Sequence, residues 1–222
     1  MTWIKICGIT NLDDAMTAVD AGADAVGFVF YEKSPRKIDV ETASEIVSKL
    51  PERVEKVGVF VDHDSGAVRD AIKRARLTAV QLYGRILAEL VKDPTRAPSW
   101  TMGAKVIPAI PGDDLKDGFT GSDSIKNRMF AILLDAGSNG SAGGTGTAFD
   151  WQAARGMVQA ISLTIPVIIA GGLTSTNVNE AIRLFQPFGA DVASGVELSP
   201  GKKDREKVRA FIDAVRAEDK RN

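Results

Sequence analysis

Short apolar segments alternate with amphipathic segments along the whole chain. Eight runs rich in Val, Ile and Phe are candidate strands: Ile4–Gly8, Ala25–Phe30, Val54–Val61, Ala79–Tyr83, Lys105–Ile110, Ala131–Asp135, Pro166–Gly171 and Asp191–Val196. Their continuous apolar character is typical of strands that are buried on both faces. The alternation predicts repeated βα units around a parallel sheet.

Several intervening segments carry helix signals. Leu12–Asp20 lies between an asparagine and a glycine, and Val40–Leu50 lies between an aspartate and a proline, which are common residue types at helix ends. Near the C-terminus an apolar stripe at helical spacing predicts a helix docked on the body: Val208, Phe211, Ile212 and Val215. Arg85–Arg96 and Gly112–Arg128 have weaker helical patterns.

The number of strand candidates sets the expected fold. Eight candidate strands in 222 residues, most followed by a possible helix, predict an α/β fold of the (β/α)8 TIM-barrel type. A doubly wound open sheet is the alternative. No linker or low-complexity segment divides the chain, so residues 1–222 are expected to form one barrel domain.

Charge and composition exclude several kinds of partner. Lys and Arg total 28 and Asp and Glu total 29, so the net charge of −1 gives no field that would gather nucleic acid or anionic lipid. No stretch approaches the ~18 apolar residues of a membrane span, and the first residues lack the pattern of a signal peptide. A cytoplasmic protein is therefore expected, with no nucleic-acid or membrane partner.

The chain has one cysteine, Cys7, and one histidine, His63. A single cysteine cannot form an internal disulfide, and these two residues are too few for a Cys/His metal cluster. The sequence therefore predicts no structural metal. His63 is interpreted as an exposed loop residue, and the three tryptophans, Trp3, Trp100 and Trp151, as packing residues.

Two reactive side chains end predicted strands. In a (β/α)8 barrel the active site lies at the carboxyl ends of the strands, which is where Cys7 and Asp135 fall. Taken alone, Cys7 is as consistent with a small core residue, and Asp135 with a turn residue. Facing each other across the barrel mouth, the two groups would form an acid and base pair.

Glycines follow the last two predicted strands. Gly171 and Gly172 follow one strand, and Ser194 and Gly195 fall at the end of the other. Loops at these positions often bind phosphate in TIM barrels, because glycine lets backbone N–H groups approach an anion. The glycines after Asp135 match neither a Walker motif nor a dinucleotide-binding motif. A phosphorylated small molecule is therefore the expected substrate class.

One arginine also lies beyond a predicted strand. Arg36 stands in Ser34-Pro35-Arg36-Lys37, where the proline stiffens the loop. Its planar guanidinium matches a carboxylate, although most loop arginines are simply solvated.

These segments resemble the phosphoribosylanthranilate isomerases, (β/α)8 enzymes of tryptophan biosynthesis. The resemblance rests on short motifs in the family's order: Lys5–Thr10, Gly22–Phe30, Ser34–Arg36, Val57–Val61, Val80–Leu82, Leu133–Asp135, Gly143–Gly146 with Phe149–Trp151, Ala170–Leu173 and Ser194–Glu197. It implies an Amadori rearrangement of N-(5-phosphoribosyl)anthranilate to 1-(2-carboxyphenylamino)-1-deoxyribulose 5-phosphate, without cofactor or metal.

The resemblance also implies roles for individual residues. Cys7 matches the family's general base and Asp135 its general acid. The implied substrate-binding residues are Arg36, for the anthranilate carboxylate, and Gln81, Tyr83, Gly144, Gly171, Gly172, Ser194 and Gly195, among them the phosphate-binding glycine loops. Tyr83 is a departure, because the family usually has histidine there.

Both proton-transfer groups need shifted pKa values for these roles. Cys7 requires an electropositive, partly open site that lowers its pKa, with Lys5 or a helix N-terminus as possible sources of charge. Asp135 requires apolar surroundings that raise its pKa.

Two alternatives stay open. One is a related isomerase that acts on another phosphoribosyl amine, as in the histidine pathway. The members of that family have an aspartate where this sequence has Cys7. The other is a catalytically silent barrel that binds a phosphorylated metabolite. The sequence leaves monomer and homodimer equally open.

Overall fold

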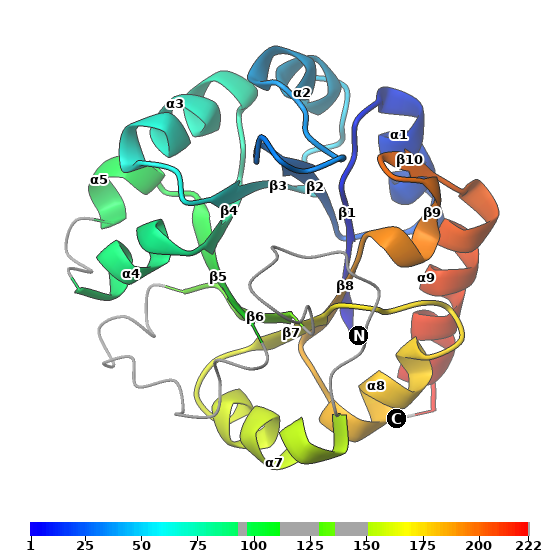
Figure 1. Ribbon diagram of the computed structural model, residues 1–222. Coiled ribbons are helices and arrows are strands. Elements are labelled where there is room, and N and C mark those ends of the chain that lie inside the picture. Colours follow the sequence, from blue (N-terminus) through cyan, green and yellow to red (C-terminus); the bar gives the residue numbers. More distant parts are fainter. Residues whose placement is uncertain (93–96, 112–128, 136–150, 222) are drawn as a thin grey trace.

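The computed structural model describes residues 1–92, 97–111, 129–135 and 151–221. Eight parallel strands form a closed barrel with helices around its outside (Figure 1). The strands are β1 Trp3–Cys7, β2 Ala25–Val29, β3 Glu55–Val61, β4 Ala79–Tyr83, β5 Lys105–Pro111, β6 Ile132–Asp135, β7 Val167–Ala170 and β8 Gly189–Val192. The predicted (β/α)8 barrel is confirmed.

Closure of the sheet decides between the two predicted folds. β1 pairs in parallel with β2 on one side and with β8 on the other, so the first and last strands of the sheet are neighbours. Lys5 is the register partner of both Ala25 and Asp191. A doubly wound open sheet has two unpaired edges, and the barrel has none.

The helices lie outside the ring of strands (Figure 1). They are α1 Leu12–Ala21, α2 Val40–Val47, α3 Ser65–Ala75, α4 Arg85–Lys92, α5 Ala97–Thr101, α7 Trp151–Ser162, α8 Val178–Phe185 and α9 Arg205–Asp219. The weak helical pattern at the start of 85–96 does form a helix, α4. The predicted segment 112–128 lies outside the described residues.

Capping residues fix the ends of the first two helices. Asn11 accepts a hydrogen bond from the Asp14 amide, and Gly22 ends α1 in the left-handed conformation at φ 100°. Asp39 caps α2 by accepting from the Thr42 amide. α2 ends at Val47 rather than at the predicted Leu50, because the last three residues turn more tightly, with the Leu50 amide bonded to the Val47 carbonyl.

Side chains alternate between two cores because successive residues of a strand point to opposite faces. One core lies between the barrel and the helices and includes Ile4 and Ile6 of β1. The other lies inside the barrel and includes Cys7, Val57 and Leu133. The residue type at alternate positions thus determines which side chains reach the barrel interior.

The end of β8 differs from the prediction. β8 covers Gly189–Val192, and residues Ser194–Val196 form a short 3-10 helix, η3, instead of continuing the strand. A two-stranded antiparallel hairpin follows, made of β9 Glu197–Ser199 and β10 Lys202–Lys203. This arrangement brings the polar segment after β8 over the barrel mouth.

The C-terminal helix closes the ring, as the apolar stripe predicted. α9 packs against both α1 and α8 (Figure 1), and Val208, Phe211 and Val215 are fully buried. In the part of the chain that is described, no helix has the length and apolar character needed to cross a membrane.

The three tryptophans are packing residues, as predicted. Trp3 stacks on Phe188, Trp151 meets Phe185 edge to face, and Trp100 is partly buried against the outer core. His63 is half-buried rather than exposed, with Nδ1 2.9 Å from the Val61 carbonyl oxygen and its ring against Phe60.

Candidate active site

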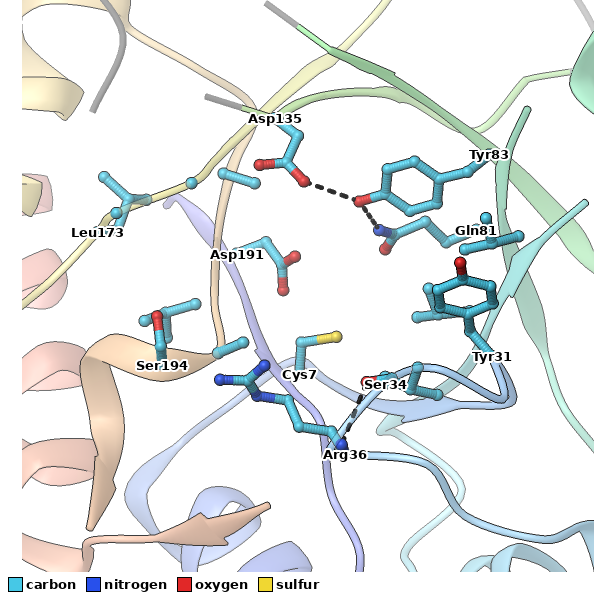
Figure 2. A pocket seen from close by; sticks show the side chains of 18 residues that line it. Cys7, Tyr31, Ser34, Arg36, Gln81, Tyr83, Asp135, Leu173, Asp191 and Ser194 are labelled. Carbon is cyan, nitrogen blue, oxygen red and sulfur yellow. Dashed lines mark hydrogen bonds between the residues drawn. The ribbon is translucent and has the colours of Figure 1, made fainter. Parts of the chain in front are cut away.

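A pocket opens at the carboxyl ends of the barrel strands and collects most of the predicted site residues. Its volume is about 680 Å³, counting the solvent in its mouth. Such a volume suits a small metabolite. The polar side chains that line it are Cys7, Tyr31, Ser34, Arg36, Gln81, Tyr83, Asp135, Asp191 and Ser194, with Gly171 and Gly172 in the wall (Figure 2). Val29, Val59 and Val61 form an apolar side.

Cys7 is the last residue of β1 and points into the barrel interior. Only 7% of its surface is exposed. Burial raises the pKa of the Cys7 thiol and the charge of Asp191 raises it further, and together they outweigh the lowering by Lys5 and Lys203. The expected lowering of the Cys7 pKa is therefore wrong, although Cys7 does line the pocket beside two lysines, and the raised pKa favours the protonated thiol at neutral pH.

The ion pair between Lys5 and Asp191 reduces the effect of the Lys5 charge on the pKa of Cys7. Its side chain is completely buried, and Nζ donates to Asp191 Oδ1 at 2.9 Å and to Gln81 Oε1 at 2.8 Å. Burial lowers the pKa of Lys5, but Asp191 and Cys7 more than compensate, so the pKa is raised overall. Lys5 is thus a charged lysine, and the carboxylate of Asp191 offsets its field at Cys7.

Asp135 ends β6 with only 5% of its surface exposed. It faces the pocket, and its Oδ2 accepts a hydrogen bond from the Tyr83 hydroxyl at 3.1 Å (Figure 2). The same hydroxyl accepts from Gln81 Nε2 at 3.0 Å. The family resemblance predicted one site that contains Cys7, Gln81, Tyr83 and Asp135. All four line the same pocket.

Arg36 lies at the mouth of the pocket in a buried ion cluster. Its Nε and Nη2 donate to the two carboxylate oxygens of Glu197 at 2.9 and 2.8 Å. Lys203 Nζ donates to the same carboxylate at 2.8 Å. Arg36 is therefore not a solvated loop residue: it is held in place by a residue more than a hundred positions away in the sequence.

The loop after β7 has two glycines in the left-handed region, Gly171 at φ 86° and Gly172 at φ 65°. A side chain would strain the backbone at both positions. Asn177 pins this loop, because its Nδ2 donates to the Gly172 carbonyl at 3.0 Å and its Oδ1 accepts from the Thr174 amide at 2.8 Å. These two bonds hold the loop at the pocket wall.

Ser194 and Gly195 begin η3, and of the two only Ser194 lines the pocket. Gly195 packs so closely on the loop after β7 that an added Cβ would lie 1.9 Å from the Leu173 carbonyl oxygen. Glycine is required there by this close approach of two loops. Gly144, the remaining predicted substrate-binding residue, lies outside the described residues.

Several residues of this site were not predicted. Asp191, Glu197, Lys203 and Asn177 hold Lys5, Arg36 and the loop after β7. Asp191 carried one detectable signal, because a charged residue inside an apolar strand must find a partner when it is buried. The others lie on segments whose position depends on the closed barrel.

No group of three or more His, Cys, Asp or Glu residues in the described ranges is arranged to hold a metal ion.

Comparison with known proteins agrees with this geometry. The family model of N-(5'-phosphoribosyl)anthranilate (PRA) isomerase matches residues 4–214. The N-(5'-phosphoribosyl)anthranilate isomerase of Pelobacter propionicus is 42% identical over 214 residues, which cover 96% of this chain and 94% of that protein.

Solved structures of the same family have the same fold. Phosphoribosyl anthranilate isomerase from Thermotoga maritima is 36% identical, with a TM-score of 0.80 over 98% of this chain and 100% of that chain. A phosphoribosyl anthranilate isomerase in complex with reduced 1-(o-carboxyphenylamino)-1-deoxyribulose 5-phosphate gives 36% identity and a TM-score of 0.78 over the same shares.

A further Thermotoga maritima structure, of monomers generated from the dimeric enzyme, is also 36% identical, with a TM-score of 0.77 over 98% of this chain and 100% of that chain. The barrel, the pocket at its carboxyl end and these matches agree, and the chain belongs to the phosphoribosylanthranilate isomerase family.

Proposed function

We propose that this pocket catalyses the Amadori rearrangement of N-(5-phosphoribosyl)anthranilate to 1-(2-carboxyphenylamino)-1-deoxyribulose 5-phosphate, the isomerisation used in tryptophan biosynthesis. The reaction moves protons within one molecule and changes no overall oxidation state. It therefore needs one group that donates a proton and one that removes a proton, which are the roles we assign to Asp135 and Cys7.

Asp135 acts first, as the general acid. It gives its proton to the ring oxygen of the ribose while the bond between that oxygen and C1 breaks. The lone pair of the anthranilate nitrogen forms the C1=N bond, so the products of this step are a protonated open-chain Schiff base and a carboxylate on Asp135. Burial of Asp135 keeps the carboxyl away from bulk water during this transfer.

Cys7 acts second, as the general base. Its thiolate removes the proton from C2, the electron pair of that C–H bond forms the C1=C2 bond, and the electron pair of the C1=N π bond returns to nitrogen, which gives an enolamine. In the tautomerisation that follows, C1 gains a proton and the C2 hydroxyl loses one to give the ketone, and one proton passes from Cys7 back to Asp135 to restore the starting enzyme. Because the pKa of Cys7 is raised in this state, the active form is the minor thiolate population at neutral pH.

The remaining pocket residues would bind the two ends of the substrate. The two hydrogen bonds from Arg36 to Glu197 use Nε and Nη2 and do not involve Nη1. The guanidinium is therefore suited to bind the anthranilate carboxylate as well. The loop after β7, with Gly171 and Gly172, and the start of η3, with Ser194 and Gly195, are suited to the phosphate. Val29, Val59 and Val61 would line the aromatic ring.

One observation carries the proposal. The only cysteine of the sequence and a buried aspartate end two strands of the barrel that are not neighbours, β1 and β6, and both line one pocket (Figure 2).

The test follows the fluorescence of freshly formed N-(5-phosphoribosyl)anthranilate with wild type, Cys7→Ser and Asp135→Asn. Asp70→Asn, an exposed change on the outer helix α3, is the matched control. We expect wild type and Asp70→Asn to consume the substrate and form the deoxyribulose phosphate, and the two pocket variants to lose most turnover while still binding it. A wild-type protein that binds the substrate without converting it would overturn the proposal and favour a silent binding barrel.

A further inference from the structure

A continuous chain of buried hydrogen bonds runs from Lys5 to Asp135. Lys5 Nζ donates to Gln81 Oε1 at 2.8 Å, Gln81 Nε2 donates to the Tyr83 hydroxyl at 3.0 Å, and that hydroxyl donates to Asp135 Oδ2 at 3.1 Å. Figure 2 shows the last two bonds beside the pocket. None of these four residues has more than 9% of its surface exposed. The chain thus connects β1, β4 and β6 inside the barrel.

The chemistry of Lys5 fixes the direction of every bond in this chain. An ammonium group only donates, so the amide oxygen of Gln81 must face Lys5 and the amide NH2 must face Tyr83. The Tyr83 oxygen is then an acceptor from Gln81, and its single proton points to Asp135. A buried glutamine and tyrosine without such an anchor would have two possible orientations.

The Tyr83 hydroxyl remains a donor throughout the working range of the enzyme. Burial raises its pKa well above the ordinary value of 10.0, and the negative charges of Asp135, Asp191 and Cys7 raise it further. Within the described ranges, the titratable groups that act on the hydroxyl are these three and, through Gln81, the cation of Lys5.

We propose that Tyr83 is a positioning residue for the general acid Asp135, and that Lys5 and Gln81 set the direction of its hydrogen bond. The inference rests on the proposed function. When Asp135 gives its proton to the ring oxygen, a carboxylate forms in a buried site, and the Tyr83 proton stabilises that charge. Tyr83 keeps its own proton, so no further proton transfer is needed.

This role differs from a substrate contact. Both the proton and an acceptor site of the Tyr83 hydroxyl are engaged by protein groups, Asp135 and Gln81. A substrate contact contributes to binding and appears in KM, whereas support of Asp135 contributes when the carboxylate forms and appears in kcat.

The test is Tyr83→Phe, which removes only the hydroxyl and keeps the ring. The hydrogen bond to the forming carboxylate stabilises the transition state, so its loss should lower kcat about tenfold to a hundredfold. KM should stay within about twofold of the wild-type value. Gln81→Met should change kcat in the same direction, because the hydroxyl is then free to turn.

Asp135→Asn provides the background that separates the two roles. Adding Tyr83→Phe to it should cause no further loss, since the acid on which Tyr83 acts is already gone. A rise in KM at unchanged kcat, or an equal loss with and without the Asp135 carboxyl, would overturn the inference.

A readout that does not depend on turnover keeps the inference separate from the proposed reaction. In carbon-13 NMR of labelled aspartate, Tyr83→Phe should raise the pH at which the Asp135 carboxyl titrates by about one to two units. Wild type inactive on the substrate would reject the proposed function alone. An unchanged Asp135 titration in Tyr83→Phe would reject the inference even in an active enzyme.

Discussion

The substitution Glu197→Gln tests whether the ion cluster at the barrel mouth holds this part of the fold together. Glu197 accepts from Arg36 Nε and Nη2, from Lys203 Nζ and, at 3.3 Å, from the Gly201 amide. Glutamine has almost the same shape but only one acceptor oxygen and no charge. Its NH2 group would face an N–H donor of Arg36 or Lys203, so the cluster cannot be satisfied.

Burial sets the size of the effect. The side chains of Glu197, Arg36 and Lys203 are only 4%, 11% and 0% exposed. Removing one partner from such a buried pair leaves a charge without compensation and costs about 3–5 kcal/mol. For a chain of this length each kcal/mol corresponds to about 2–4 °C in Tm, so a fall of about 6–20 °C is expected.

The assay is thermal and urea unfolding followed by circular dichroism, with Glu41→Gln as the matched control. Glu41 pairs with Arg74 on the surface, where the side chains are 64% and 48% exposed. An exposed pair contributes about 0–1 kcal/mol, so the control variant should be nearly as stable as wild type.

The pH dependence gives an independent check. Burial tends to raise the pKa of Glu197, but the hydrogen bonds and charges of Arg36 and Lys203 outweigh it and hold the pKa below its ordinary value of 4.5. Its contribution is therefore complete above the unfolded pKa and is lost as pH falls through the folded pKa. The difference between wild type and Glu197→Gln should shrink under acidic conditions. Equal losses for Glu197→Gln and Glu41→Gln, or a difference independent of pH, would refute this reasoning.

Three further predictions concern the pocket. Because burial raises the pKa of Cys7, the rate at which iodoacetamide alkylates Cys7 should still increase with pH above the ordinary thiol pKa of about 8.5, and a rate that levels off below that pH would contradict the raised pKa. Asn177→Ala removes both bonds that pin the loop after β7, so KM measured in the fluorescence assay should rise several-fold with little change in kcat. Gly195→Ala would place a methyl group 1.9 Å from the Leu173 carbonyl oxygen, so the Tm in thermal unfolding should fall below that of wild type. An unchanged Tm would show that the two loops are not tightly packed.

Much of the architecture follows from local patterns in the sequence. The apolar runs gave the positions of all eight barrel strands, because a strand covered on both faces needs apolar residues at every position. Helix caps such as Asn11 and Asp39 were readable because a cap is a contact between residues about three positions apart. The ends of α2 and β8 were misplaced, since tight turns and η3 depend on what packs above them.

The candidate site could be predicted only in part, because many of its contacts join residues that are far apart in the sequence. Cys7 and Asp135 stood out because reactive side chains at the ends of apolar strands are rare, and the family resemblance gave Arg36 and the glycines. Their surroundings were not readable. Glu197 reaches Arg36 across 161 positions, and Lys5 reaches Asp191 across 186.

The sequence by itself determined the βα alternation, and hence the elements, and it supplied the reactive groups, because both depend on residue type and short-range spacing. The tertiary structure alone decided that the sheet closes, that Asp191 offsets the charge of Lys5 beside Cys7, and that Tyr83 donates to Asp135. These depend on distances between strands far apart in the chain and on the loss of water around buried charges. The raised pKa of Cys7, opposite to the expectation from its neighbouring lysine, is the consequence.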